Sequence, residues 1–167
     1  MVFRFSESHL PLKKQLKYGN GDKIILPQND LQSFSTLSQK VYTLKLCNPR
    51  CYKDKIVAGV LDFDAPDKIA FVPDWIMDAL CLNSGDKMNA DPIVLGPVTE
   101  VTFKFPPDII DPKAVLEYLL SRHTVLYENK KIKVKMFEKE YTFQVVHITP
   151  PYGTICNADV TLNLVNY

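Results

Sequence analysis

Short apolar runs, several of which alternate with polar residues, recur along the chain and predict β-strands. Val101, Phe103 and Phe105, for example, are separated by polar residues. Because successive side chains of a strand point to opposite faces, this alternation is typical of a strand with one buried face. Runs rich in β-branched and aromatic residues predict strands at 23–26, 41–46, 56–63, 69–72, 87–94, 98–105, 131–137, 140–148 and 159–165. Glu138 and Lys139 are expected to form the two-residue turn of a hairpin.

Helices are predicted at residues 29–37, 73–82 and 111–122. The last is the clearest, because Asp111 is a favoured N-cap and Pro112 suits a first turn. Apolar residues then recur at helical spacing. Trp75 lies on the apolar side of the second helix, so we expect it to pack in the core rather than bind a ligand.

Two adjacent prolines, Pro106 and Pro107, indicate a boundary between two lobes, since neither can join a central strand. Residues 21–105 precede this boundary and form a strand-rich lobe. Residues 109–167 follow it with one helix and several strands. Residues 1–20 are interpreted as an N-terminal extension.

Composition narrows the classes of function. The hydrophobic fraction of 46% is sufficient for a core, and the net charge is only +1. A nucleic-acid partner is therefore not expected, because phosphate binding usually requires a clustered basic excess. No apolar run approaches the roughly 20 residues that span a bilayer, so no membrane partner is expected either. The four cysteines are interpreted as free thiols of a reducing compartment.

The chain lacks the motifs that carry common catalytic chemistry. It has no Gly-x-Ser-x-Gly elbow and no glycine-rich loop that opens a helix. His123 and His147 have no partner at a metal-ligand spacing, and both are interpreted as structural. We therefore expect no catalytic residue, no metal and no cofactor.

Two groups of residues are candidates for binding another protein. Asp62, Asp64 and Asp67 lie together at a predicted hairpin tip. They form either a solvated turn or the acidic rim of a contact surface. Tyr152 follows two prolines and precedes a glycine, which indicates an exposed aromatic side chain at a loop tip.

Five motifs, taken together, resemble the N-terminal domain of the ubiquitin-fusion-degradation protein family. They occur in the family order and extend from about residue 21 to residue 165. They are Gly-Asp-Lys-Ile-Ile-Leu-Pro at 21–27, Gly-Val-Leu-Asp-Phe at 59–63, Val-Pro-Asp-Trp-Ile-Met at 72–77, Asp-Pro-Lys-Ala-Val-Leu-Glu at 111–117 and Glu-Lys-Glu-Tyr at 138–141.

The resemblance implies a fold and a function. The first lobe would be a double-psi β-barrel and the second a smaller α+β roll. The chain would be a non-catalytic ubiquitin- or polyubiquitin-binding domain, cytoplasmic and nuclear. Asp62, Asp64, Asp67 and Tyr152 would then be candidates for contacting ubiquitin, whose usual recognition surface is an apolar patch rimmed by basic side chains.

The family pairs with a nuclear-protein-localization partner and delivers ubiquitinated clients to the AAA+ segregase called valosin-containing protein. The motifs for both partners lie in a later tail, so we expect this chain to be a fragment. Departures from the family pattern, such as Tyr-Glu-Asn-Lys-Lys at 127–131, leave an alternative open. In that alternative the chain is a protein- or peptide-binding adaptor in an organellar protein-import copy of the machinery. An enzyme that cleaves its own chain would need a Gly-Ser site, which the sequence lacks.

Overall fold

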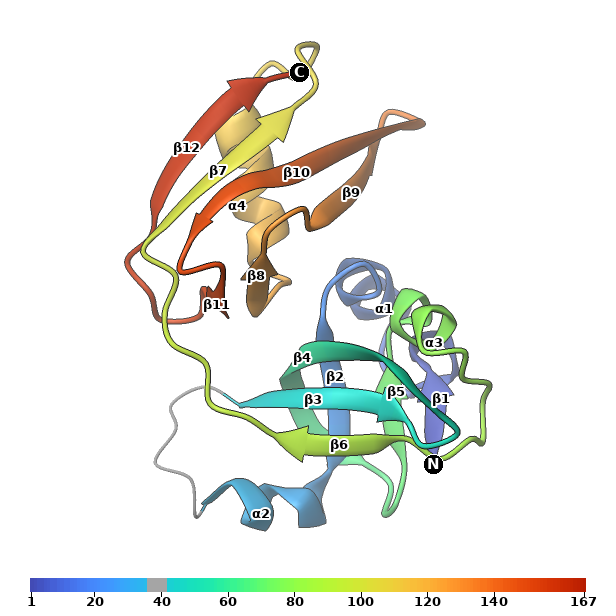
Figure 1. Cartoon of the computed structure of the whole chain (residues 1–167). Helices are drawn as coiled ribbons and strands as arrows, with labels where there is room; N and C mark the ends of the chain where they lie inside the picture. Colours follow the sequence, from blue (N-terminus) through green and yellow to red (C-terminus); the bar gives the residue numbers. More distant parts are fainter. Residues whose placement is uncertain (36–41) are drawn as a thin grey trace. The chain divides into compact units, whose positions relative to one another are not determined.

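The computed structural model describes residues 1–35 and 42–167, apart from the side chains of Ser33, Ser35 and Lys53. It divides the chain into two compact units, Met1–Val94 and Leu95–Tyr167 (Figure 1). Within the described residues the protein is mainly β with few helices, which agrees with the predicted class.

Unit 1 contains a six-stranded mixed sheet in the order β1-β5-β2-β4-β3-β6. Its strands are β1 Val2–Arg4, β2 Lys23–Pro27, β3 Thr43–Asn48, β4 Cys51–Ala65, β5 Ala70–Val72 and β6 Asn89–Pro92. The β1–β5 and β2–β4 pairs are parallel, and the remaining pairs are antiparallel. Among the described residues, no pairing between β1 and β6 closes the sheet into a barrel.

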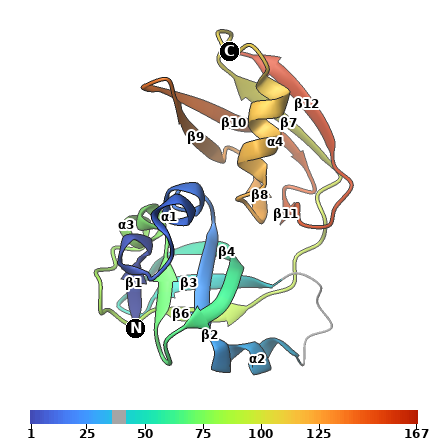
Figure 2. The same cartoon turned by 180° about the vertical axis from the view of Figure 1, so that it is seen from behind.

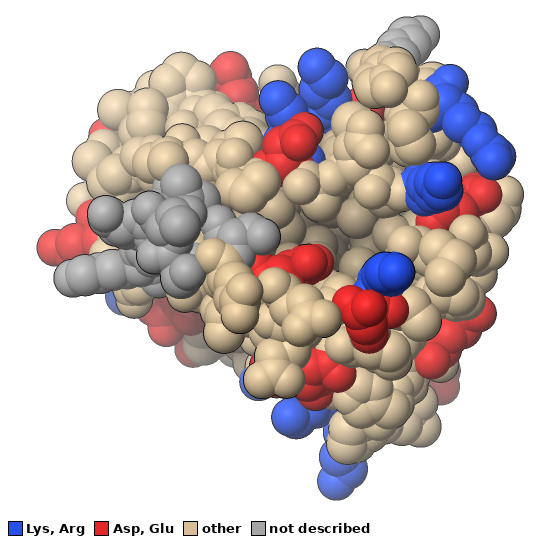
Figure 3. Space-filling model, turned by 90° about the horizontal axis from the view of Figure 1, so that it is seen from below, with Lys and Arg blue, Asp and Glu red and all other residues tan. Residues whose placement is uncertain are grey.

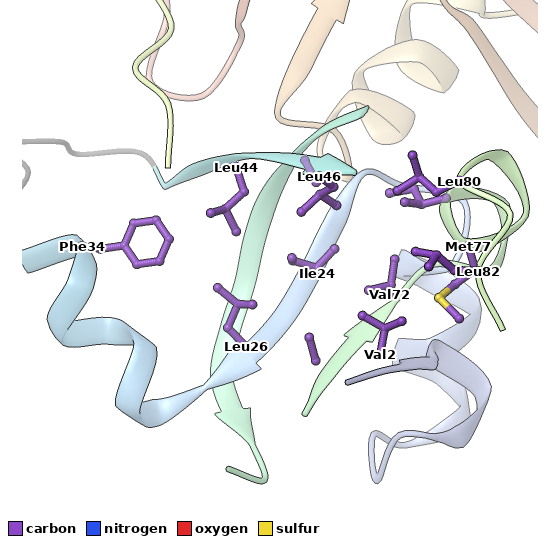
Figure 4. Close-up of a cluster of buried hydrophobic side chains, with 13 residues drawn as sticks. Val2, Ile24, Leu26, Phe34, Leu44, Leu46, Val72, Met77, Leu80 and Leu82 are labelled. Carbon is purple, nitrogen blue, oxygen red and sulfur yellow. The ribbon is translucent and has the colours of Figure 1, made fainter. Parts of the chain in front are cut away.

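The central strand β2 is buried on both faces of this sheet. Ile24 and Leu26 belong to one cluster, with side chains of β3, β5 and α3 around them (Figure 4). Ile25, which points to the opposite face, packs with Phe5 and Phe71 in a second cluster. A strand buried on both sides reads as a continuous apolar run, which is why residues 23–26 lack alternation. Burying one such side chain stabilises the fold by about 1.5–3 kcal/mol.

Three α-helices and two short 3-10 helices lie around this sheet in the described part of the chain. They are η1 Phe5–Glu7, α1 Leu12–Tyr18, η2 Gln28–Asp30, α2 Leu31–Ser35 and α3 Asp74–Ala79. The helix predicted at residues 29–37 is thus split into η2 and α2, and its last two residues lie outside the described part of the chain. The helix predicted at residues 73–82 is shorter in the structure, where α3 covers only Asp74–Ala79.

Unit 2 pairs a four-stranded sheet with one helix. The sheet order is β12-β7-β10-β9, and a separate two-stranded sheet joins β11 to β8. The elements are β7 Glu100–Phe105, α4 Pro112–Leu120, β8 Val125–Tyr127, β9 Lys131–Met136, β10 Lys139–Thr149, β11 Tyr152–Thr154 and β12 Thr161–Asn166. Helix α4 lies against one face of the larger sheet in both views (Figure 2). Its Leu116 and Leu119 join Phe103 and Phe143 in the core of this unit.

Three expectations need correction. β7 pairs with β10 and β12, so the division between units falls before this strand rather than at the two prolines after it. Residues 1–20 are not an extension, because β1 pairs with β5 and Phe5 is buried. The β9–β10 turn consists of Phe137 and Glu138, one residue earlier than predicted, since Met136 pairs with Lys139.

No helix in the described part of the chain is both long and apolar enough to cross a membrane.

Candidate functional site

The three candidate carboxylates lie at one end of the sheet in unit 1. Asp62 and Asp64 are two residues apart on β4, so both side chains point to the same face. Asp67 lies in the connection from β4 to β5. This connection is not a hairpin, because β2 lies between the two strands and the chain passes over the end of β2. The predicted hairpin tip is therefore wrong, although the three carboxylates are exposed as expected.

Each carboxylate has a local partner. Asp62 Oδ1 accepts a hydrogen bond from the backbone N–H of Phe63 at 2.8 Å. Asp64 Oδ2 lies 3.3 Å from His9 Nε2. Asp67 Oδ1 accepts a hydrogen bond of 3.1 Å from Asn29 Nδ2. These contacts hold the acidic group in place while leaving it open to solvent.

The surface between these carboxylates is less apolar than the sequence indicates. Ala65 is buried, so only Pro66 adds exposed apolar area in the turn. Phe63 points inward, as predicted, and its ring packs edge-on against Phe34 and Tyr42 at centroid distances of 5.7 and 5.5 Å. The acidic group is therefore supported by an aromatic cluster beneath β4.

Tyr152 is placed by the small sheet of unit 2. It pairs with Tyr127 across β11 and β8, and the two rings stack at 5.9 Å with an interplanar angle of 21°. About two fifths of each side chain stays exposed, at 39% for Tyr152 and 38% for Tyr127. Lys130 lies 5.4 Å from the centre of the Tyr127 ring and donates a hydrogen bond to the Val125 carbonyl. The structure thus shows a fixed pair of tyrosines where the sequence indicated a single aromatic loop tip.

A third feature, in unit 1, was missed by sequence reasoning. A groove of about 440 Å³ lies between α1 and α3, with Leu12, Leu16 and Trp75 among its apolar lining. The indole Nε1–H of Trp75 donates a 2.8 Å hydrogen bond to the Gly21 carbonyl, and the ring is half-buried against the core. Trp75 therefore packs against the core, as expected, but is only partly buried and also lines a surface groove.

The rim of this groove is charged. Asp74 and Asp78 lie one turn apart on α3 and line the groove, and Arg4, which is outside the lining, forms an ion pair with each. Arg4 Nη2 donates to Asp78 Oδ1 at 2.9 Å, and Arg4 Nη1 lies 3.9 Å from Asp74 Oδ2. The hydrogen bond that Arg4 donates to Asp78 raises the pKa of Arg4, with smaller contributions from the negative charges of Asp78, Asp74 and Glu7. Charge of both signs lies near the groove, because α1, its other wall, carries Lys13, Lys14 and Lys17.

Charge elsewhere is mixed. Figure 3 shows one face of the molecule, on which acidic and basic side chains are interspersed and neither sign forms a continuous area. This agrees with the near-balance of 20 basic and 19 acidic residues in the sequence.

Comparison with known proteins identifies the family. Residues 2–95 match the family model of ubiquitin fusion degradation protein UFD1, N-terminal subdomain 1. This match covers more than half of the chain and nearly coincides with unit 1. The chain belongs to the ubiquitin fusion degradation protein family.

Members of the family from distant organisms resemble this chain over most of its length. A ubiquitin fusion degradation protein 1 homolog from Dictyostelium discoideum is 32% identical over 167 residues, covering 95% of this chain and 49% of the relative. The human ubiquitin recognition factor in ER-associated degradation protein 1 is 33% identical, covering 78% of this chain and 44% of the relative. The ubiquitin fusion degradation protein 1 of Saccharomyces cerevisiae is 27% identical, covering 78% of this chain and 37% of the relative. The chain thus spans about half the length of the curated relatives, or less.

Proposed function

We propose that this chain is a non-catalytic ubiquitin-binding domain that acts in ubiquitin-dependent protein degradation. The observation that carries the proposal is the human relative, which is 33% identical over 78% of this chain and is named a ubiquitin recognition factor. The match of residues 2–95 to the family model gives further support. As in the family, the chain would deliver ubiquitinated clients to an AAA+ segregase together with a nuclear-protein-localization partner, in cytoplasm and nucleus.

The same resemblance supports a finer assignment of the fold. We assign unit 1 to the double-psi β-barrel type and unit 2 to the α+β roll type. The mixed sheet of unit 1, with parallel β1–β5 and β2–β4 pairs, is compatible with such a barrel topology. The helix-covered sheet of unit 2 suits the roll.

Asp62, Asp64 and Asp67 are one proposed contact surface for ubiquitin, and Tyr152 with its stacked Tyr127 is another. Carboxylates beside a protein contact complement a basic rim on the partner and mainly accelerate association. Exposed tyrosines held by stacking contribute apolar contact area at a low entropic cost, because their rings are already fixed.

The first test is a titration of the isotope-labelled chain with ubiquitin, followed by NMR at low and high salt. Replacing Asp62, Asp64 and Asp67 together by Asn should weaken binding about threefold to tenfold, because exposed charge pairs contribute roughly 0–1 kcal/mol each. The affinity of the triple variant should also depend less on salt, since the attraction that salt screens, between these carboxylates and basic side chains of ubiquitin, has been removed. Tyr152→Ala should weaken binding at both salt concentrations, because it removes apolar contact.

A matched control removes the same charge elsewhere. Asp54, Asp91 and Asp159 are exposed and lie outside the β4–β5 connection, so their replacement by Asn should leave affinity nearly unchanged. Equal affinity and equal salt slope for the two triple variants would show that the carboxylates do not contact ubiquitin. If the unaltered chain shows no saturable shift with either ubiquitin or a ubiquitin chain, the proposed function itself is wrong.

A further inference from the structure

The larger sheet of unit 2 ends on β12, which has a neighbouring strand on one side only. It pairs in parallel with β7, and Figure 2 shows it as the outer strand of the sheet. The N–H of Thr161 donates a 2.9 Å hydrogen bond to the carbonyl of Thr99, and the N–H of Tyr167 donates one of 3.0 Å to the carbonyl of Phe105. In a parallel pair the backbone groups of alternate residues point to the neighbour, so those of the residues between them point away. The outward groups on β12 belong to Leu162, Leu164 and Asn166.

These outward groups have no protein partner in the described structure. Within residues 1–35 and 42–167, no hydrogen bond reaches the backbone N–H or C=O of the three residues. A row of such groups is a template for a further strand. A strand offers N–H and C=O groups at the same spacing, whereas a helix uses its own groups internally. The conformation that fits this edge is therefore an extended one.

The other three edges of the two larger sheets are blocked. At β1, the N–H of Val2 donates a 2.9 Å hydrogen bond to the carbonyl of Asp86, and the carbonyl of Val2 accepts one of 2.8 Å from the N–H of Gly85. Strand β6 contains Asp91 and Pro92. Strand β9 carries three exposed lysines, Lys131, Lys133 and Lys135. Covering loops, charges and proline are the usual means of keeping an edge from pairing. Strand β12, with the sequence Thr-Leu-Asn-Leu-Val-Asn, has neither a charge nor a proline.

The side chains of β12 indicate which residues an added strand would carry. Leu162 pairs with Val101 and Leu164 with Phe103, so both leucines point to the face that α4 covers. Val101 and Phe103 are fully buried, whereas the two leucines are only partly buried at the margin of the same core. An apolar side chain beside each leucine would complete its burial. The matching segment therefore has apolar residues at alternate positions.

Charge around β12 is balanced, which narrows the occupant further. Glu100 of β7 accepts a 2.8 Å hydrogen bond from Asn163, and Lys104 of β7 lies 5.0 Å from the centre of the Tyr167 ring. On α4, one basic and one acidic residue form an i, i+4 ion pair. Asp159, two residues before β12, adds a single exposed carboxylate. Such an edge favours an uncharged segment, and it offers little to the basic rim of ubiquitin's usual recognition surface.

We propose that β12 binds an extended, uncharged segment of a partner protein, which adds a fifth strand to the sheet of unit 2. Backbone hydrogen bonds to Leu162, Leu164 and Asn166 hold the segment, and its alternate apolar side chains pack beside the two leucines. Strand addition of this kind is a recurring mode of peptide recognition. A stable complex of two folded copies takes about 20–30 residues from each side. A six-residue strand provides far fewer, so a short segment suits this edge better than a second copy of the chain.

The first experiment uses a peptide with blocked ends and the sequence Gln-Val-Thr-Val-Thr-Val-Gln. It should bind the isotope-labelled chain saturably, with a Kd of about 0.1–1 mM. Amide hydrogen exchange at Leu162, Leu164 and Asn166 should slow on binding, because their N–H groups gain an acceptor. The amides of β9 should be unaffected. A peptide in which Glu replaces each Val should bind at least about tenfold more weakly, since its carboxylates would lie beside the leucines.

Two N-methylated peptides test whether the backbone makes the contact. Methyl groups on the three Val nitrogens remove one set of N–H donors, and methyl groups on the two Thr nitrogens remove the other. An added strand directs only one set toward β12, which is the Val set if it pairs antiparallel and the Thr set if it pairs in parallel. One peptide should therefore lose affinity at least about tenfold, and the other should stay within about threefold of the parent.

Substitutions on β12 remove one outward N–H at a time. Leu164→Pro removes a donor that points away from β7, so the bonds to β7 are kept, and an edge strand tolerates proline at such a position. The matched control, Leu164→Ala, loses the leucine contact but keeps the N–H. The proline variant should bind the peptide at least about fivefold more weakly than the alanine variant. The pair Asn166→Pro and Asn166→Ala repeats the comparison at an exposed side chain, and it decides the matter if Leu164→Pro does not fold.

Several results would overturn the proposal. They are the absence of a saturable shift up to about 5 mM peptide, equal effects of the two methylated peptides, and equal affinities of the Pro and Ala variants. Dimerisation that Leu164→Pro abolishes and Leu164→Ala does not would make a second copy of the chain the occupant. Ubiquitin affinity that falls in the Pro variant alone would make ubiquitin the occupant. The peptide measurements do not depend on ubiquitin, so failure of the proposed function can be distinguished from failure of strand addition.

Discussion

At the scale of single residues, Phe137 has the least expected conformation. It is fully exposed at the tip of the β9–β10 hairpin, and its φ is 48°, followed by 65° at Glu138. Two positive φ values in a two-residue connection are typical of a type I′ turn, where Asn and Gly are preferred. A bulky side chain in this region is strained, because its Cβ approaches the following carbonyl.

Phe137→Asn should therefore stabilise unit 2 by about 0.5–1 kcal/mol, because Asn adopts the left-handed conformation more easily. Chemical denaturation followed by circular dichroism measures this change. Phe137→Ala is the matched control, since alanine loses the same exposed ring but keeps the strain. If Ala stabilises the protein as much as Asn does, the effect comes from removing the ring and the interpretation in terms of strain fails.

At the scale of elements, α4 has the best-defined beginning. Asp111 Oδ1 accepts a 3.0 Å hydrogen bond from the backbone N–H of Ala114, and Pro112 occupies the first turn. The first backbone N–H groups of a helix have no partner within the helix, so a side-chain cap satisfies one of them.

Asp111→Ala should cost about 1 kcal/mol of unfolding free energy, because that N–H loses its acceptor. Asp111→Ser should retain most of the stability, since its hydroxyl caps as well. Thermal unfolding of the three proteins at neutral pH provides the comparison. Equal losses for Ala and Ser would show that the cap is not what Asp111 contributes.

The elements also show where sequence reasoning succeeds and where it stops. Strands β7 and β10 and the capped helix α4 were predicted at nearly their observed positions, whereas β4 begins at Cys51, before its predicted start at residue 56. The three-residue strands β1, β8 and β11 were missed, because three residues are too few to establish a period. Helix α1 was missed for a different reason. Its two leucines, Leu12 and Leu16, face the groove rather than the core, so the helix has no buried apolar stripe.

The candidate carboxylates illustrate the same limit. The exposure of Asp62 and Asp64 followed from the alternation of residues along β4. The position of β2 between β4 and β5 could not be predicted in this way. Sheet order depends on contacts between residues distant in sequence, such as Ile25 with Phe71. Local patterns contain no information about such contacts, so a connection over a strand end looks the same as a hairpin turn. The partners His9 and Asn29 were unpredictable for the same reason.

At the scale of the whole molecule, the two units have separate hydrophobic cores. Ile24 belongs to the core of unit 1, and Ile132 belongs to the core of unit 2. Ile24→Val and Ile132→Val are matched substitutions, and each should cost about 0.5–1.5 kcal/mol. Hydrogen exchange should quicken mainly in the unit that carries the substitution, because each core consists of residues of one unit. Equal acceleration in both units for both variants would show that they unfold as one cooperative body.

The pairing of β1 with β5 has a consequence for how the chain folds during its synthesis. Phe3 pairs with Phe71, and the amino group of Met1 donates a 2.8 Å hydrogen bond to the carbonyl of Lys68. A ribosome adds about 5–20 residues per second, so the first strand waits on the order of several seconds for its neighbour. Throughout that interval Val2 and Phe5 remain in water, because β5, beside which both are buried in the finished fold, has not been made. Val2 and Phe5 can therefore be buried only after residues 70–72 have been synthesised, although they are made about 70 residues earlier.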